Sequence, residues 1–209
     1  DRVTATFAYH FQDQEAGGRT ANHRDALDLG NYESGARFVE PNDRETELLA
    51  AEITADLDFA SLTFAAGWSE FSERGQRDQT DLLLDFGFGY EDFPMFAAFT
   101  RERVAEDRFS QEVRLVSNGT GPWSWIGGFY YNEFERNSLS QEFTPGFPAF
   151  LGLDPPFGDL EYQQTTRREL TETALFGEVT YELDERWAFT LGGRLFDYDM
   201  EQFVSFDLP

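Results

Sequence analysis

The sequence predicts an all-β protein, an antiparallel up-and-down transmembrane β-barrel segment of about seven strands with long external loops. Three observations predict it. Apolar and polar side chains alternate along many short stretches, short connections alternate with long ones, and aromatic residues make up 17% of the 209 residues. Alternation is typical of a sheet with one apolar face, and aromatic residues gather where a barrel meets the membrane interfaces.

The clearest element is a predicted hairpin over residues 109–131. Its two arms alternate on either side of Asn118 and Gly119, a dipeptide that favours a two-residue type I′ turn. Trp123 and Trp125 lie on the apolar phase of the second arm. Each arm has roughly 9–11 residues, which is the length that a tilted strand needs to cross a bilayer.

The remaining predicted strands have the same alternation. They cover residues 3–12, 49–59, 62–69, 175–183 and 187–195, and residues 198–206 either continue the last strand or form a loop flap. Short connections are predicted at residues 60–61, 118–121 and 184–186, and long ones at residues 13–45, 72–107 and 134–170. Compact soluble domains have a median connection of roughly 4–6 residues, whereas outer-membrane barrels combine short periplasmic turns with long external loops.

Aromatic residues close to the short turns predict a belt at the periplasmic interface, because amphipathic rings favour the headgroup level. These residues are Phe59, Trp123, Trp125, Tyr181 and Trp187. The alternative is a soluble, secreted β-sandwich, a carbohydrate-binding module with long ligand loops at one end.

Composition excludes several classes of function. A net charge of −24 argues against nucleic-acid binding, because contacts with phosphates need basic patches. Cysteine is absent and only two histidines are present, so common zinc sites are excluded, and no metal site or cofactor is predicted. The chain starts within a strand pattern, so we expect residues 1–209 to be a partial barrel domain, with its remaining strands elsewhere.

Residues 107–136 (DRFSQEVRLVSNGTGPWSWIGGFYYNEFER) resemble a segment of the barrel of TonB-dependent outer-membrane receptors. Residues 172–199, with FGEVTY and LGGRLF, resemble the next hairpin, and LDFASLTFAAGWSEF resembles the preceding one. The resemblance implies a 22-stranded barrel in the cell outer membrane, occluded by a plug domain and driven through TonB, ExbB and ExbD. It implies uptake of a scarce, bulky nutrient, such as a ferric siderophore, without enzymatic chemistry. The plug, the nutrient, membrane lipid and lipopolysaccharide would be the partners.

Charged residues on the polar phase of the strands are predicted to face the lumen. They are Glu52, Asp56, Asp58, Glu112, Arg114, Glu178 and Arg194. We interpret them as a hydrated lattice of ion pairs that holds the wall and the plug in register, with a direct role in the substrate path as the alternative.

Two predicted loop stretches, residues 82–99 and 143–157, are unexpectedly apolar, and exposed apolar patches usually mark a contact. They either pack on one another or form an aromatic rim that captures the ligand. The candidate ligand contacts are Phe86, Tyr90, Phe93, Phe147, Phe150 and Phe157. We interpret the acidic clusters in the loops as solvated surface. The alternative is that divalent cations bridge these carboxylates to lipopolysaccharide. They would repel an anionic ligand, so they favour a neutral or cationic one.

Overall fold

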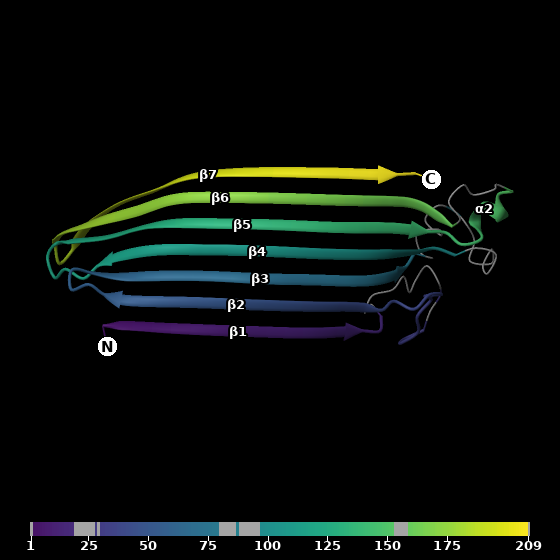
Figure 1. The fold of residues 1–209 in the computed structure, drawn as a ribbon, viewed down its shortest axis with the longest axis horizontal. Helices are drawn as coiled ribbons and strands as arrows, with labels where there is room; N and C mark the ends of the chain where they lie inside the picture. Colours follow the sequence, from purple (N-terminus) through teal and green to yellow (C-terminus); the bar gives the residue numbers. More distant parts are fainter. Residues whose placement is uncertain are drawn as a thin grey trace.

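The computed structural model describes residues 2–18, 28, 30–79, 87, 97–152 and 159–208. They form one seven-stranded antiparallel sheet in which every strand pairs with its neighbours in chain order, β1 to β7 (Figure 1). The strands are β1 (Val3–Ala16), β2 (Asn42–Asp56), β3 (Ala60–Asp78), β4 (Phe99–Ser117), β5 (Trp123–Phe143), β6 (Leu160–Asp184) and β7 (Trp187–Asp207). A short helix, α2 (Phe147–Phe150), lies between β5 and β6.

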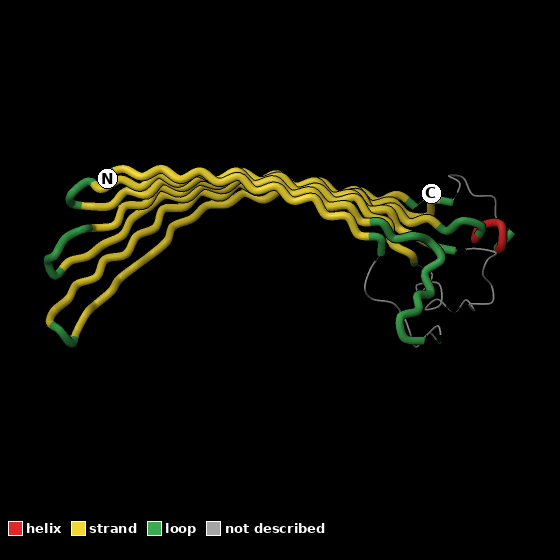
Figure 2. Tube along the Cα trace, turned by 90° about the horizontal axis from the view of Figure 1, so that it is seen from below, coloured by secondary structure: helices red, strands yellow, loops and turns green. Residues whose placement is uncertain are grey.

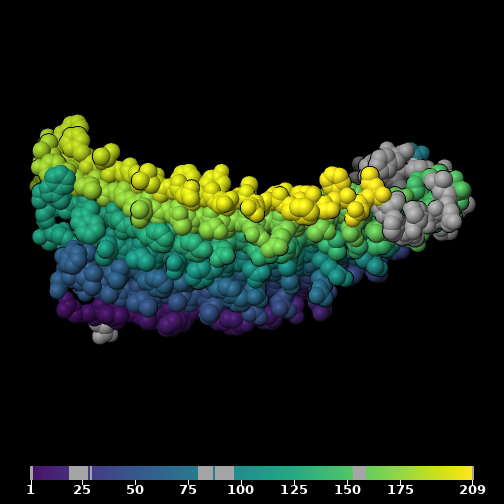
Figure 3. Space-filling view, turned by 45° about the horizontal axis from the view of Figure 1, so that its top comes forward, coloured from purple at the N-terminus to yellow at the C-terminus, as the bar shows by residue number. Residues whose placement is uncertain are grey.

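The sheet is a single curved layer (Figure 2). In the space-filling view the strands lie side by side in chain order, with one face open along their length (Figure 3). Trp125 and Leu191 are 36% and 82% exposed, so neither is enclosed between two sheets. The up-and-down fold is therefore confirmed, and the described residues contain no sandwich of two facing layers.

The register separates the side chains into two faces across all seven strands. We call the first the apolar face, because its central rows are aliphatic and aromatic. One such row joins Ala5, Ile53, Phe64, Val113, Phe129, Leu175 and Leu195. We call the other the polar face, and its neighbouring row joins Thr6, Glu52, Ala65, Glu112, Tyr130, Ala174 and Phe196.

The strands are longer than predicted, from 14 residues in β1 to 25 in β6. The long connections consequently cover only residues 17–41, 79–98 and 144–159, so the predicted loop boundaries were wrong. Towards the loops both faces of the sheet carry polar residues, and the apolar alternation that marks a strand in the sequence disappears. The backbone ladder nevertheless continues. Residues 198–206 are indeed the continuation of the last strand, within β7.

The short turns also differ in detail from the prediction. The β2–β3 turn lies at residues 57–59, before the predicted Ala60 and Ser61. Residues 118–122 form a five-residue connection in which neither Asn118 nor Gly119 has a positive φ, so the type I′ turn was wrong. The Asn118 side chain instead accepts a hydrogen bond from Ser61 Oγ at 2.8 Å and donates one to Asp56 Oδ1 at 3.1 Å. It thereby joins two neighbouring turns.

Candidate functional site

The apolar face has a band limited on both sides by aromatic residues. Near the short turns, the rings of Trp123 and Tyr181 lie 4.5 Å apart, and further along the strands those of Phe109 and Tyr131 lie 6.3 Å apart. From Trp123 to Tyr131 the strand rises by about 26 Å, which is about 20 Å along the membrane normal after the usual tilt. This height is close to the apolar band of roughly 25 Å in outer-membrane barrels.

An acidic row follows this band on the same face. Its residues lie opposite one another on six neighbouring strands: Glu47, Glu70, Asp107, Glu135, Glu169 and Glu201. Carboxylates are costly in hydrocarbon, so the acidic row marks the edge at which the apolar face leaves it. The sequence shows each of these carboxylates separately, but only the register aligns them, and sequence reasoning therefore missed the row.

The polar face contains six of the seven residues predicted to face the lumen. Glu52 and Glu112 share a row, Arg114 and Arg194 share the next, and Asp56 and Glu178 belong to the one after that. Asp58 is the exception, because it lies in the β2–β3 turn with a φ of 66° and pairs with Arg2. Its predicted place on a strand was wrong, since the strand ends at Asp56.

Ion pairs connect several strands across the polar face. An Arg194 terminal nitrogen lies 2.6 Å from a Glu172 carboxylate oxygen, and an Arg136 terminal nitrogen lies 3.0 Å from one of Glu106. Arg194 also lies over the Tyr130 ring, 5.4 Å from its centroid. Of the residues predicted to form a lattice of ion pairs, Arg194 takes part in one of these two pairs, and its partner Glu172 lies on the neighbouring strand.

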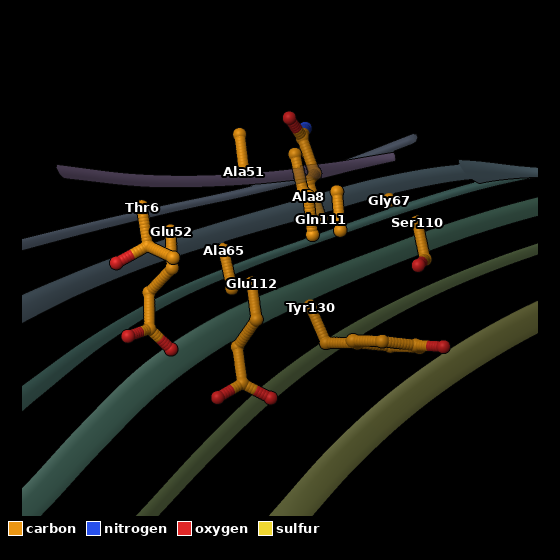
Figure 4. Close-up of a pocket in the computed structure, with 12 residues that line it drawn as sticks. Thr6, Ala8, Ala51, Glu52, Ala65, Gly67, Ser110, Gln111, Glu112 and Tyr130 are labelled. Atoms are coloured by element: carbon orange, nitrogen blue, oxygen red, sulfur yellow. The ribbon is translucent and has the colours of Figure 1, made fainter. Parts of the chain in front are cut away.

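The middle of the polar face is hollowed over about 260 Å³ where the lining residues are small, among them Ala8, Ala65 and Gly67. Glu52, Glu112 and Tyr130 project from the sheet on this side (Figure 4). Among the described residues, Glu52 has no ion-pair partner, and Glu112 lies 3.8 Å from Arg114 on its own strand. The hollow is therefore acidic and open to a further element.

The predicted aromatic contacts in the loops are only partly described. Phe86, Tyr90, Phe93 and Phe157 lie outside the described residues. Phe147 and Phe150 are in α2, which follows Gly146 in the left-handed conformation that glycine favours (φ 84°). Phe150 is 37% exposed, so part of its ring faces solvent.

The base of the loops contains a cluster that sequence reasoning missed. Phe143, assigned to an apolar loop, is the last residue of β5 and stacks on Phe99 of β4 at 5.0 Å between ring centroids. Phe38 also packs on Phe99, at 4.6 Å between ring centroids, and Arg101 lies over both strand rings at 5.2 Å. The signal available in the sequence was the aromatic residue on each strand, but their pairing depends on strand ends that the alternation does not show.

A buried carboxylate anchors the loop segment next to this cluster. Asp78 Oδ2 accepts hydrogen bonds from the backbone N–H groups of Arg37 and Phe38 at 2.7 and 2.8 Å, and Asp78 is 2% exposed. Residues 36–41, which we call the strap, therefore lie along the end of β3 where β2 no longer pairs with it. Gln76 completes the contact through its backbone N–H, which donates to Pro41 O at 2.9 Å.

The sequence model of the TonB-dependent receptor-like β-barrel matches residues 1–206. The chain belongs to this family. Proteins of the family are outer-membrane receptors, and this placement agrees with the apolar band and its aromatic limits. No curated protein matches the chain.

Two solved structures resemble the fold. The ferric yersiniabactin uptake receptor FyuA from Yersinia pestis has 12% identity and a TM-score of 0.63, and the match covers 98% of this chain and 32% of that receptor. The siderophore receptor PiuA from Acinetobacter baumannii has 10% identity and a TM-score of 0.46, over 98% of this chain and 37% of that one. The chain thus spans about a third of the length of these receptors.

Two further observations are limited to the described residues. These residues include no helix that is long and apolar enough to span a membrane. They also include no group of three or more histidine or acidic side chains arranged to hold a metal ion.

Proposed function

We propose that this chain forms part of the barrel wall of a receptor that imports a scarce, bulky nutrient, such as a ferric siderophore, across the outer membrane. The observation that supports this most strongly is the division of one sheet into two faces. The apolar face has the height and the aromatic limits of a surface that contacts lipid. The polar face has charged and hydroxyl side chains suited to a water-filled interior.

Energy for import would come from TonB, ExbB and ExbD, acting through a plug domain elsewhere in the protein. Membership of the family supports this assignment. The acidic hollow around Glu52 and Glu112 offers the plug an open surface on the polar face. Uptake consists of binding at the external end and passage beside the displaced plug, so no covalent step is required.

The nutrient would first meet the loops that follow β1, β3 and β5. Phe147 and Phe150 in α2 are the candidate contacts among the described residues, and Phe86, Tyr90, Phe93 and Phe157 complete the proposed rim. The name of FyuA, a ferric yersiniabactin uptake receptor, makes a ferric complex the first ligand to test.

The experiment is uptake of radioactive iron by cells that produce the full-length receptor, with a panel of ferric siderophores and with or without functional TonB. We expect uptake above the receptor-free background that disappears without TonB. Phe150→Ala should lower uptake several-fold while the receptor still assembles in the outer membrane. Uptake that continues unchanged without TonB would refute the proposed coupling, and a receptor in the soluble fraction would refute the membrane assignment.

A further inference from the structure

A cluster of side chains with oxygen atoms lies at the loop end of the polar face, where β4, β5 and β6 are neighbours. The register places Thr100 of β4 and Tyr162 of β6 directly opposite Glu142 of β5. Glu142 lies eleven residues beyond Tyr131, or about 36 Å further along the strand. The cluster is therefore well outside the apolar band.

A β-bulge adds a second carboxylate to this cluster. The register between β5 and β6 shifts next to Glu142, which lies opposite Tyr162, and Glu161 has no residue opposite it. Such an extra residue leaves the regular alternation, and its side chain is aimed in a new direction. Burial raises the pKa of the Glu142 carboxyl, and the negative charge of Glu161 raises it further. The two carboxylates thus repel each other across a short distance.

The nearest guanidinium group does not neutralise these carboxylates. Arg77 lies in the same row, opposite Thr100, and its charge lowers the pKa of Glu142. This effect is smaller than that of burial and that of Glu161, so the pKa of Glu142 is still raised. Arg77 pairs instead with Glu102 on the neighbouring strand, at 3.4 Å. The cluster consequently has too little positive charge.

Two buried hydroxyl groups accompany the carboxylates. Thr100 is 1% exposed, and Thr144, the first residue after β5, is 6% exposed. Within the part of the chain that the structure describes, neither Thr100 Oγ1 nor Thr144 Oγ1 has a hydrogen-bond partner. Buried hydroxyls of this kind destabilise a fold, so a ligand that uses their lone pairs would stabilise it. Because Thr100 and Glu142 lie directly opposite on one face, their Cβ atoms are about 4.5–5.5 Å apart, and both side chains can reach one ion.

The available donor atoms select the class of ligand. They are all oxygen atoms, from two carboxylates and two hydroxyl groups. Oxygen atoms suit hard cations, and calcium accepts an irregular set of roughly six to eight of them, which water and backbone carbonyls can complete. Magnesium demands a nearly ideal octahedron, and zinc prefers nitrogen and sulfur ligands. Calcium therefore fits this cluster best.

We propose that Glu142, Glu161 and the Thr100 hydroxyl bind a calcium ion, with the Thr144 hydroxyl as a further ligand. Half of these ligands are hydroxyls, so the site differs from the larger groups of acidic side chains considered above. The Thr144 N–H donates to Asp159 O at 2.8 Å, which closes the foot of the loop that carries α2. The ion joins β4 to both ends of this loop and thereby fixes its position. The inference does not rest on the proposed transport function.

The test uses the purified full-length receptor, freed of divalent ions with a chelator, and calcium chloride as the probe. The readout is hydrogen exchange at the Thr144 amide. With calcium at about ten times its dissociation constant, local opening should be about tenfold rarer, so this exchange should slow about tenfold. Calorimetry measures the dissociation constant, which we expect at roughly 0.1–1 mM, as in other extracellular calcium sites.

Two substitutions should remove the effect of calcium. Thr100→Val and Glu142→Gln should each weaken calcium binding by about tenfold or more, the loss that is usual even for residues that only support a metal ligand. Thr100→Val is the sharper test, because its hydroxyl has no other partner among the described residues and the calcium-free receptor should remain as stable as before. Thr165→Val, on the other face of β6, is the matched hydroxyl control, and Glu201→Gln in the acidic row is the matched charge control.

Every outcome decides the inference. If calcium leaves the exchange at Thr144 unchanged, or if Thr100→Val and Glu142→Gln bind calcium as well as the two controls do, the site is wrong. Equal slowing by magnesium chloride at the same concentration would overturn the assignment to calcium. Loss of calcium binding in the two variants but not in the controls would establish the site, even if uptake proved independent of TonB. Failure of the calcium site, in turn, would leave the transport proposal intact.

Discussion

The two halves of the sheet have the same backbone and different chemistry. From the short turns to the acidic row, one face is mainly apolar and most of the charges lie on the other, with Glu133, Asp197 and Asp199 as the charged residues at the loop-side limit of the apolar face. Beyond this row, both faces are charged, and Arg167 lies 2.5 Å from Glu169 and 3.6 Å from Glu135 on what was the apolar face. The hydrogen-bonded ladder is continuous across the change. The backbone N–H and C=O groups are therefore hydrogen-bonded both in lipid and in water, and only the side chains differ between the half that contacts lipid and the half that contacts water.

Burial differs between the halves as well. Near the loops, Asp78, Thr100, Phe99 and Thr144 are all less than 9% exposed. In the apolar band, large residues such as Phe129 and Leu191 remain exposed, at 36% and 82%. The loop end thus has a small protein core of its own, whereas the band depends on lipid to cover its side chains. Substitutions should act through different mechanisms in the two halves.

The largest expected effect comes from a charge placed on the apolar face. Trp125→Asp places a carboxylate where the structure has an indole, and it should destabilise the inserted barrel by about 3 kcal/mol through lost apolar contact and the transfer of charge to lipid. We expect the receptor to be nearly absent from the outer-membrane fraction on immunoblots. Ser124→Asp, one residue earlier and on the polar face, is the matched control and should assemble normally. Equal assembly of both variants would reverse the assignment of the faces.

A glycine pair in β5, at the height of the band, tests the packing on the two faces of the sheet, with Gly128 on the polar face and Gly127 on the apolar face. A Cβ on Gly128 would lie 2.4 Å from Phe176 Cζ and 2.7 Å from Val113 O, and the backbone oxygen is fixed by the sheet. Overpacking of this kind costs about 1–3 kcal/mol. Gly128→Ala should therefore lower the midpoint of urea unfolding in detergent or lipid vesicles.

The neighbouring residue provides the control for this substitution. A Cβ on Gly127, on the apolar face, would approach only Phe176 O, at 3.9 Å. Gly127→Ala should change the free energy of unfolding by less than about 0.5 kcal/mol, because the space is open. Similar losses in both variants would mean that these positions need glycine for the flexibility of the strand, and not to leave room for the ring of Phe176.

The same contrast explains what the sequence could predict. In the apolar band, alternation predicts the strand, its two faces and its aromatic limits. Trp123 and Trp125 accordingly lie on the apolar face, and six of the seven residues predicted to face the lumen lie together on the polar face. Beyond Trp68 and Tyr131 the alternation ends although the strands continue, and the loops were therefore predicted too long. The Phe38–Phe99–Phe143 cluster joins residues up to about a hundred positions apart, and only the register brings them together. Asp58 was misplaced because its polar phase continues the strand pattern into the turn.

The smallest effect on the barrel as a whole is expected from a substitution at the strap. Asp78→Ala removes the acceptor of two backbone N–H groups, and leaving buried donors unpaired costs about 1–3 kcal/mol. Because the strap lies outside the band, this cost should appear as local opening rather than as loss of the barrel. Exchange of the Gln76 amide hydrogen, which is bonded to Pro41 O, should become about tenfold faster, since about 1.4 kcal/mol corresponds to one factor of ten. The control is Asp107→Ala in the acidic row, which should leave the exchange at Gln76 unchanged. If Asp78→Ala instead lowers the melting temperature of the whole receptor as much as Gly128→Ala does, the loop end and the band are one cooperative unit, and their apparent independence is wrong.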